Sequence, residues 1–279
     1  MEVTFHVRPA DEEVAEMIAA CLEARGFENF LYTEDGVKAY APVSEFDEEV
    51  VEKALAIPAF REGRTVSWEK EYIEEKDWNK AWEESFRPVV VAGRVRVRAG
   101  FHEADKEMEH EIVIDPKMSF GTGHHPTTAL MLEAILEMQP LAGKVIDAGC
   151  GTGILSIMAA KAGATEVLGF DVDEWAYRNA LENAAVNGAE GVRVFLGDGA
   201  LLDGEREAGL VLANISRNAL VEDMPRYARA LSRGGRLVAS GFYGADLPVV
   251  REAARVAGLA FASSREEGEW CVAIFNKGQ

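Results

Sequence analysis

The sequence has few cysteines and no long apolar run. Three cysteines occur among 279 residues, Cys21, Cys150 and Cys271, and none belongs to a C-x-x-C pair. This spacing indicates neither a disulfide framework nor a zinc site, so we expect small buried apolar residues and no bound metal. No apolar run approaches the roughly 18 residues that span a bilayer, and the first residues lack a basic segment followed by an apolar one. We therefore expect a cytoplasmic protein without a membrane segment.

Basic residues are also scarce. The chain has 29 Lys and Arg against 48 Asp and Glu, which gives a formal net charge of −19 at pH 7. Such a charge repels nucleic acid and attracts basic partners, although an acidic surface can also serve solubility alone. Residues 1–62 carry fifteen of the acidic residues and only five basic ones. We expect no direct binding of nucleic acid, and a basic protein partner for this N-terminal region.

Residues 1–66 predict a small α+β domain. Apolar residues alternate in EVTFHV, recur at helical spacing in DEEVAEMIAACLEARG, and alternate again in FENFLYT and VKAYAP around the turn EDG. A helix, DEEVVEKALAI, and a strand, RTVSWE, complete the order strand–helix–strand–strand–helix–strand. This order is typical of the ferredoxin-like, or split βαβ, arrangement.

Residues 67–87 predict a linker helix between two domains. The segment has no glycine, and it ends before Pro88. Trp78, Trp82 and Phe86 recur every four residues with charged residues between them, which is the pattern of an amphipathic helix. The same aromatic residues could instead belong to the core of either neighbouring domain.

Residues 88–279 predict a larger α/β domain. It opens with a hairpin, VVVAGRVRVRAGF, and a strand, EHEIVID, and from residue 144 onward strands and helices alternate. Repeated strand–helix alternation indicates a parallel sheet with helices on both faces. The last two strands, LAFASSREE and EWCVAIFN, are joined by a tight turn and must be antiparallel. A ligand of such a sheet binds at the carboxyl ends of its strands.

Three glycines follow the first strand of this alternation, in the stretch VIDAGCGTGILS. A dinucleotide-binding loop would need glycine at position 154, which is Ile154. The pattern D-x-G-x-G-x-G from Asp147 to Gly153 instead resembles motif I of the class I S-adenosylmethionine-dependent methyltransferases. That resemblance implies a Rossmann-like seven-stranded sheet and S-adenosylmethionine as cofactor. The loop alone could also be a structural turn of another α/β domain.

Two carboxylates end neighbouring strands. Asp171 ends EVLGFD, where a carboxylate accepts hydrogen bonds from ribose hydroxyls in such folds. Asp173, two residues later, is better placed to cap the next helix. Asp198, in LGDG, resembles the methyltransferase residue at the adenine edge, although an aspartate in a turn is the commoner meaning.

Asn214 ends the strand GLVLAN, beside the predicted cofactor. Its amide oxygen can accept a hydrogen bond from an incoming N–H group. Methyltransferases of planar amides have Asn-Pro-Pro-Tyr here, and this chain has Asn-Ile-Ser-Arg. Without the stacking ring, an aliphatic amine or a related nucleophile is a better methyl acceptor than a planar group. A helix N-cap is the alternative role for Asn214.

The most distinctive stretch is MSFGTGHHPTTALMLEAI, residues 118–135. It resembles the ribosomal protein L11 methyltransferase family (PrmA), as do DWNKAWEESFRP, ANI and the acidic N-terminal domain. The resemblance implies that the N-terminal domain recognises a large-subunit ribosomal protein, and that Phe120 to Gly123 cover the methionine end of the cofactor. The cofactor-binding candidates are Phe120, Gly121, Thr122, Gly123, Thr128, Asp147, Gly149, Gly151, Asp171, Asp198 and Asn214. The catalytic candidates are Asn214, Thr122 and His124.

His124 and His125 lie next to each other in this stretch. No H-E-x-x-H pattern or carboxylate cluster accompanies them, so a metal site is not indicated. His124 could act as a general base, and the alternative is packing or a hydrogen bond at the start of the following helix.

The predicted activity is protein N-methylation of lysine or N-terminal α-amino groups of the L11 protein by a monomeric enzyme. A lysine with a pKa near 10.4 costs about 4.6 kcal/mol to deprotonate at pH 7, whereas an α-amine costs only about 1 kcal/mol. We expect the proton to leave to solvent. The alternatives are a methyltransferase of another basic protein or small amine, and a binding module without activity.

Overall fold

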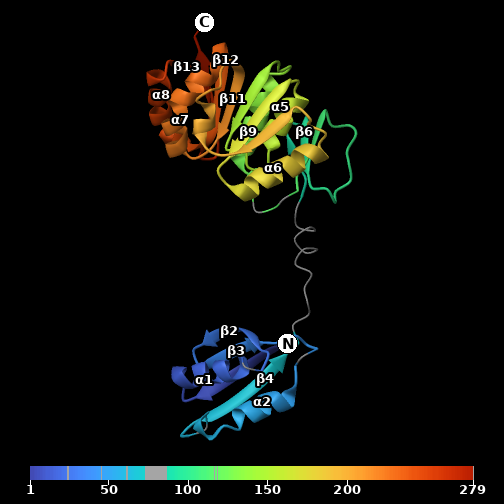
Figure 1. The fold of residues 1–279 in the computed structure, drawn as a ribbon, viewed down its shortest axis with the longest axis vertical. Coiled ribbons are helices and arrows are strands. Elements are labelled where there is room, and N and C mark those ends of the chain that lie inside the picture. The colour runs from blue at the N-terminus through green and yellow to red at the C-terminus, as the bar shows by residue number, and fades with distance from the viewer. Residues whose placement is uncertain are drawn as a thin grey trace. The chain divides into compact units, whose positions relative to one another are not determined.

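The computed structural model describes residues 1–72 apart from 24, 45 and 61, and residues 87–278 apart from 116 and 118. Its contacts divide the chain into two compact units, Met1–Trp82 and Glu83–Gln279, drawn in Figure 1. Each unit has an apolar core of its own. No helix among the described residues is long and apolar enough to cross a membrane.

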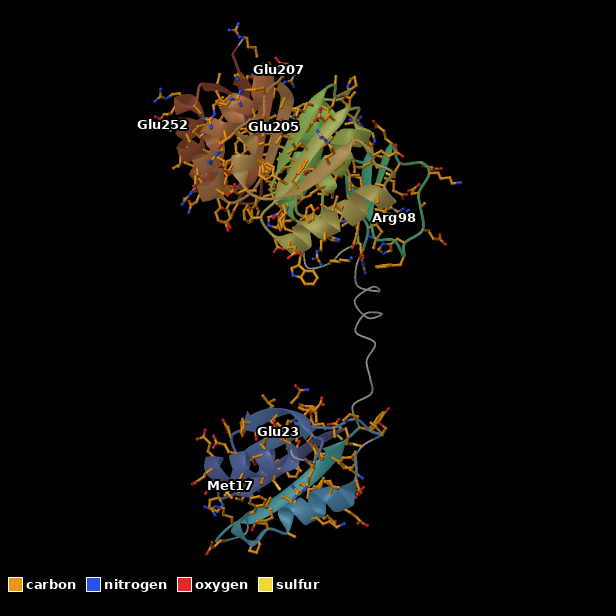
Figure 2. The ribbon with its side chains drawn as sticks, viewed as in Figure 1. Met17, Glu23, Arg98, Glu205, Glu207 and Glu252 are labelled. Carbon is orange, nitrogen blue, oxygen red and sulfur yellow. The ribbon has the colours of Figure 1, made fainter. Side chains whose placement is uncertain are left out.

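The N-terminal unit is a four-stranded antiparallel sheet with two helices, in the predicted element order. Its elements are β1 (Glu2–Arg8), α1 (Glu12–Glu23), β2 (Glu28–Thr33), β3 (Gly36–Tyr40), α2 (Glu48–Leu55) and β4 (Thr65–Glu71). The strand order is β2-β3-β1-β4. Val3, Phe5 and Val7 are fully buried because alternate residues of β1 point to one face of the sheet. Met17 and Glu23 of α1, labelled in Figure 2, are exposed.

Strand β4 continues further than the sequence predicted. It pairs with β1 from Thr65 to Glu71, and Val66 and Trp68 pack against the core. The predicted strand RTVSWE is confirmed and extends to Glu71, so the predicted linker helix 67–87 is wrong over its first residues, 67–71, where the period-two burial of β4 outweighs the helical pattern. The aromatic residues of the predicted linker helix, Trp78, Trp82 and Phe86, lie outside the described residues.

The C-terminal unit is built around a seven-stranded sheet, as predicted. Its elements are β5 (Val89–Val91), β6 (Val95–Arg98), β7 (His110–Val113), α4 (Pro126–Glu137), β8 (Lys144–Ala148), α5 (Ile154–Lys161), β9 (Glu166–Asp171), α6 (Glu174–Val186), β10 (Val192–Leu196), the 3₁₀ helix η2 (Gly199–Leu202), β11 (Ala208–Asn214), α7 (Arg217–Ala230), β12 (Leu231–Tyr243), α8 (Leu247–Val256), β13 (Leu259–Glu267) and β14 (Trp270–Lys277).

The strand order of the large sheet is β10-β9-β8-β11-β12-β14-β13. The first five strands are parallel, and β14 is antiparallel to both β12 and β13, which confirms the predicted final hairpin. The last strand of the chain thus lies inside the sheet. It carries more buried apolar residues than β13, which ends in Ser, Arg and Glu and takes the edge.

Helices cover both faces of this sheet (Figure 1). Consecutive residues of β8 divide between the two cores: Val145 packs with α4 and α5, and Ile146 packs with α7 and α8. Cys150 and Cys271 are buried, as the sequence predicted for small apolar residues, and Cys21 is half-buried.

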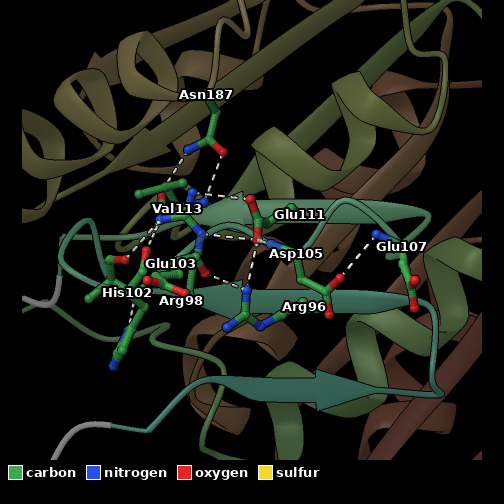
Figure 3. Close-up of polar contacts among 10 residues, drawn as sticks. Arg96, Arg98, His102, Glu103, Asp105, Glu107, Glu111, Val113 and Asn187 are labelled. Carbon is green, nitrogen blue, oxygen red and sulfur yellow. Dashed lines mark hydrogen bonds and ion pairs between the residues drawn. The ribbon is translucent and has the colours of Figure 1, made fainter.

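The small sheet β5-β6-β7 is fastened to helix α6. Arg96 and Arg98 of β6 form ion pairs with Glu111 of β7, with N–O distances of 3.0 Å (Figure 3). The backbone N–H of Val113 donates to Oδ1 of Asn187 at 2.9 Å, and Nδ2 of Asn187 donates back to the Val113 carbonyl at 2.6 Å. These bonds join the end of β7 to the C-cap residue of α6.

Candidate functional site

The glycine loop between β8 and α5 has a backbone that only glycine adopts without strain. Gly149, Gly151 and Gly153 have φ angles of +68°, +54° and +80°. A Cβ atom at Gly149 would overlap the Ile215 side chain, and one at Gly151 would overlap the Phe120 carbonyl. The loop therefore needs glycine both for its conformation and for its close neighbours.

A cavity of about 570 Å³ lies at the carboxyl ends of the central strands. Its walls are the glycine loop, the ends of β9, β10 and β11, the start of η2, one face of α7, and Phe120. This is the sheet edge at which the strand–helix alternation predicted a ligand.

Asp171 lies in this cavity at the end of β9, as predicted. Its Oδ2 accepts the Gly151 N–H at 2.9 Å, and its Oδ1 accepts the Asp173 N–H at 3.0 Å. A carboxylate oxygen can accept more than one hydrogen bond, so both remain able to bind a ligand hydroxyl. Asp173 caps α6 by accepting the N–H groups of Trp175 and Ala176, the role expected for it.

Asn214 lies in the cavity at the end of β11. Its Oδ1 is buried and has no hydrogen-bond partner among the described residues. The N-cap residue of α7 is Ser216, so the alternative role of Asn214 as a helix cap is wrong. A buried acceptor without a partner is costly, and a ligand with an N–H group would satisfy it.

Asp147 is buried beneath the glycine loop, on the side away from the cavity. It is fully buried and does not line the cavity, and its Oδ2 accepts a hydrogen bond from Ser156 Oγ at 2.6 Å. The pKa of Asp147 is raised from 3.8 to about 6, mainly by burial; the Ser156 hydrogen bonds oppose this rise, and the charge of Asp171 adds to it. The structure thus places this predicted cofactor-binding residue one layer beneath the site.

The Phe120–Gly123 loop is tied to the glycine loop. The Phe120 carbonyl accepts the Thr152 N–H at 2.9 Å, and the Gly121 carbonyl accepts Thr152 Oγ1 at 2.6 Å. Phe120 lines the cavity, whereas Gly121, Thr122 and Gly123 do not. The loop therefore reaches the cavity through one aromatic side chain.

Two further predicted residues have different surroundings. Thr128 is fully buried on α4, its Oγ1 has no partner within the described part of the chain, and it does not line the cavity. Asp198 does line the cavity, but it is exposed and caps η2 by accepting the Ala200 N–H at 2.8 Å.

The two histidines make different contacts. Nδ1 of His124 lies 3.2 Å from Thr122 Oγ1, and its Nε2 lies 3.0 Å from the Arg87 carbonyl. His125 caps α4 through Nδ1, which accepts the Thr127 N–H at 3.3 Å. The hydrogen bond at the helix start thus belongs to His125, and His124 does not line the cavity. Where the chain is described, no cluster of three His, Cys, Asp or Glu side chains could hold a metal ion.

The sequence did not reveal an aromatic group next to the cavity. The rings of Phe120 and His125 lie 5.2 Å apart, those of His125 and Trp270 lie 4.6 Å apart, and those of Trp270 and Tyr243 lie 4.4 Å apart. These residues come from a loop, the start of α4, and the facing ends of β12 and β14. Only the strand order brings them together, because β14 enters the sheet beside β12.

Sequence comparisons assign the family. The sequence profile described as "Ribosomal protein L11 methyltransferase (PrmA)" matches residues 7–278. A protein named ribosomal protein L11 methyltransferase from Phocaeicola vulgatus is 38% identical over 276 residues, which are 99% of this chain and 98% of that protein. The chain belongs to the ribosomal protein L11 methyltransferase family.

Other relatives agree with the family. A protein with the same name from Porphyromonas gingivalis is 39% identical over 270 residues, 95% of this chain and 91% of that protein. The crystal structure of a ribosomal protein L11 methylase from Lactobacillus delbrueckii superposes with a TM-score of 0.63 at 25% identity and covers 70% of this chain and 100% of that one. This member of the family is thus an S-adenosylmethionine-dependent protein methyltransferase.

The residues of the site fit this cofactor. The cavity volume of about 570 Å³ suits a ligand of this size. Asp171 offers carboxylate oxygens for hydroxyl groups, and the glycine loop lets backbone approach the ligand without side chains. The buried Oδ1 of Asn214, which lacks a partner in the described parts of the chain, indicates that a donor belongs in the cavity.

Proposed function

We propose that this chain transfers methyl groups from S-adenosylmethionine to lysine or N-terminal α-amino groups of ribosomal protein L11. The observation that carries the proposal is the buried Oδ1 of Asn214, which has no partner among the described residues and lies in the cavity. The names of the relatives support L11 as the protein that is methylated.

Several residues would hold the cofactor. Asp171 would accept hydrogen bonds from the ribose hydroxyls, and Gly149 and Gly151 would let the ligand lie against backbone. Asp198 would lie at the adenine edge, and the Phe120–Gly123 loop, with Thr128 behind it, would cover the methionine end. When bound, the cofactor supplies an electrophilic methyl group on its sulfonium.

Asn214 would orient the amine. Its carbonyl accepts an N–H of the neutral amine and thereby directs the nitrogen lone pair, because transfer requires an in-line approach. Asp147 is buried beneath the loop, and His124 does not line the cavity, which favours loss of the proton to solvent over a protein base.

The N-terminal unit would recognise the substrate protein. Its excess of acidic residues attracts a basic protein, and the same charge disfavours direct binding of nucleic acid. We propose that the enzyme acts in the cytoplasm, as a monomer.

The test is methylation of purified L11 by Asn214→Ala. We expect kcat to fall about a hundredfold or more while most of the cofactor affinity remains, since the lost contact acts mainly in the transition state. Asn218→Ala is the matched control, because Asn218 lies on α7, accepts hydrogen bonds from Arg217 through its Oδ1 and does not line the cavity. Equal kcat values for Asn214→Ala and the wild type would refute the role of Asn214.

The pH dependence separates the two kinds of amine. Without a protein base, single-turnover rates on lysine should rise about tenfold per pH unit from 7 to 9, whereas rates on an α-amine should level off near 8. A lysine rate that levels off below pH 7 would indicate a base, and His124→Ala would then test the first candidate.

A further inference from the structure

One wall of the cavity comes from α7, which the proposed function does not yet use. Ala219, Asp223 and Tyr227 recur every four residues on this helix, and all three line the cavity opposite the start of η2. One helix face therefore extends the cavity away from Asn214 and under the turn that follows β10.

The buried hydroxyl of Tyr227 is the second feature of this helix face. The residue is fully buried in the same apolar cluster as Phe170 and Leu202, and its hydroxyl oxygen has no hydrogen-bond partner among the residues described. Burial raises the pKa of Tyr227, so the group remains a neutral O–H donor at any physiological pH. A buried, unpaired hydroxyl destabilises the chain unless a ligand accepts its hydrogen bond.

Asp223 lies one helical turn before Tyr227 and is held in place. Arg226 Nη1 donates to its Oδ1 at 2.6 Å, and a Cβ atom at Gly199 would overlap the carboxylate. Gly199 has no left-handed backbone to explain its identity, so the space taken by Asp223 is the reason for glycine there. An ionised carboxylate only accepts hydrogen bonds, which limits what it can bind.

We propose that Asp223 and Tyr227 bind the purine edge of the cofactor. Asp223 accepts a hydrogen bond from the exocyclic amino group of adenine, and the Tyr227 hydroxyl donates to a neighbouring ring nitrogen. This inference rests on the proposed function, because it concerns how the same cavity selects its adenosyl ligand. An acceptor next to a donor on one helix face matches adenine, which presents a donor next to an acceptor.

Burial makes this pair more selective than Asp198. Asp198 is exposed and already caps η2, so water can replace a lost contact there. Asp223 and Tyr227 are shielded, with side-chain exposure of 17% for Asp223 and 0% for Tyr227. A ligand that mismatches a buried polar pair leaves both groups unpaired, which costs far more.

The test compares two ligands in the full-length protein by titration calorimetry. One is S-adenosylhomocysteine, and the other is its deaminated analogue S-inosylhomocysteine, which presents a carbonyl and a ring N–H instead. We expect the wild type to bind the adenine ligand about a hundredfold more tightly, because the analogue opposes the Asp223 carboxylate with a carbonyl oxygen. Asp223→Asn, whose amide can donate, should reduce this ratio to about tenfold or less.

Two further variants complete the experiment. Tyr227→Phe should weaken the binding of S-adenosylhomocysteine about tenfold without lowering the unfolding temperature of the free protein. Asp203→Asn is the matched control, because Asp203 also forms an ion pair with Arg226, at 3.4 Å, but does not line the cavity. This variant should have the same ratio of affinities for the two ligands as the wild type.

If the wild type binds the two ligands with equal affinity, the inference is overturned while the cofactor assignment stands. The same holds if Asp223→Asn has the same affinity ratio as the wild type. If the wild type binds neither ligand, the proposed function fails as well.

Discussion

The buried carboxyl of Asp147 makes folding stability depend on pH in a direction opposite to that of most acidic residues. The side chain is fully buried, and a single hydroxyl, Ser156 Oγ, donates to it. Its Oδ1 has no partner within the described residues. Desolvation therefore dominates, and the pKa rises from 3.8 to about 6 in the folded chain.

The magnitude follows from linkage. Between pH 3.8 and about pH 6 the folded chain holds this proton and the unfolded chain has lost it. The contribution of Asp147 to the free energy of unfolding is therefore fully present below pH 3.8 and is lost as the pH rises through 6. A shift of about two units corresponds to a loss of about 3 kcal/mol.

The assay is urea unfolding of the wild type and Asp147→Asn from pH 4 to pH 8. The asparagine keeps an oxygen for Ser156 and cannot ionise, so the difference in unfolding free energy, variant minus wild type, should rise by about 2.5 kcal/mol across this range, which begins just above the unfolded pKa. Asp173→Asn, an exposed cap that asparagine can also form, controls for the loss of one charge. A difference that stays constant from pH 4 to pH 8 would refute the raised pKa of Asp147.

Three other predictions concern the same unit. Asp171→Ala should weaken S-adenosylmethionine binding by about 2–3 kcal/mol in calorimetry. Asp173→Ala is the control and should lower folding stability without changing the affinity for the cofactor. Equal affinities for the wild type and Asp171→Ala would contradict the ribose contact. Gly149→Ala should lower the free energy of unfolding by about 1–3 kcal/mol, because the new Cβ overlaps the Ile215 side chain. Adding Ile215→Ala should restore part of this stability, and strictly additive losses in the double variant would contradict the overlap of the two side chains. A fragment 83–279 should bind the cofactor yet lose methylation of L11 at low substrate concentration, and full activity would reject recognition by the N-terminal unit.

The ends of the parallel strands were predictable from the sequence. Asp171 and Asn214 each end an apolar run that precedes a helix, so the local pattern alone places both at one edge of the sheet. The glycine loop was equally visible, because three glycines between a strand and a helix require a special backbone.

Features that depend on tertiary contacts were not predictable. Asp223 and Tyr227 have the spacing of an ordinary helix face, and only the packing of α7 against η2 makes that face a cavity wall. Trp270 meets His125 because β14 enters the sheet beside β12, which no local pattern specifies. An aspartate at position 147 is chemically suited to contact a ligand, so the sequence suggested that role. In the structure its side chain instead accepts a hydrogen bond from Ser156 beneath the glycine loop.

The most direct test of the central claim is mass spectrometry of purified ribosomal protein L11 after incubation with the full-length enzyme and S-adenosylmethionine. The proposed function predicts mass increments of whole methyl groups on lysine side chains or on the N-terminal amine of L11. Unmodified L11 from a reaction in which calorimetry shows the enzyme to bind the cofactor would contradict it.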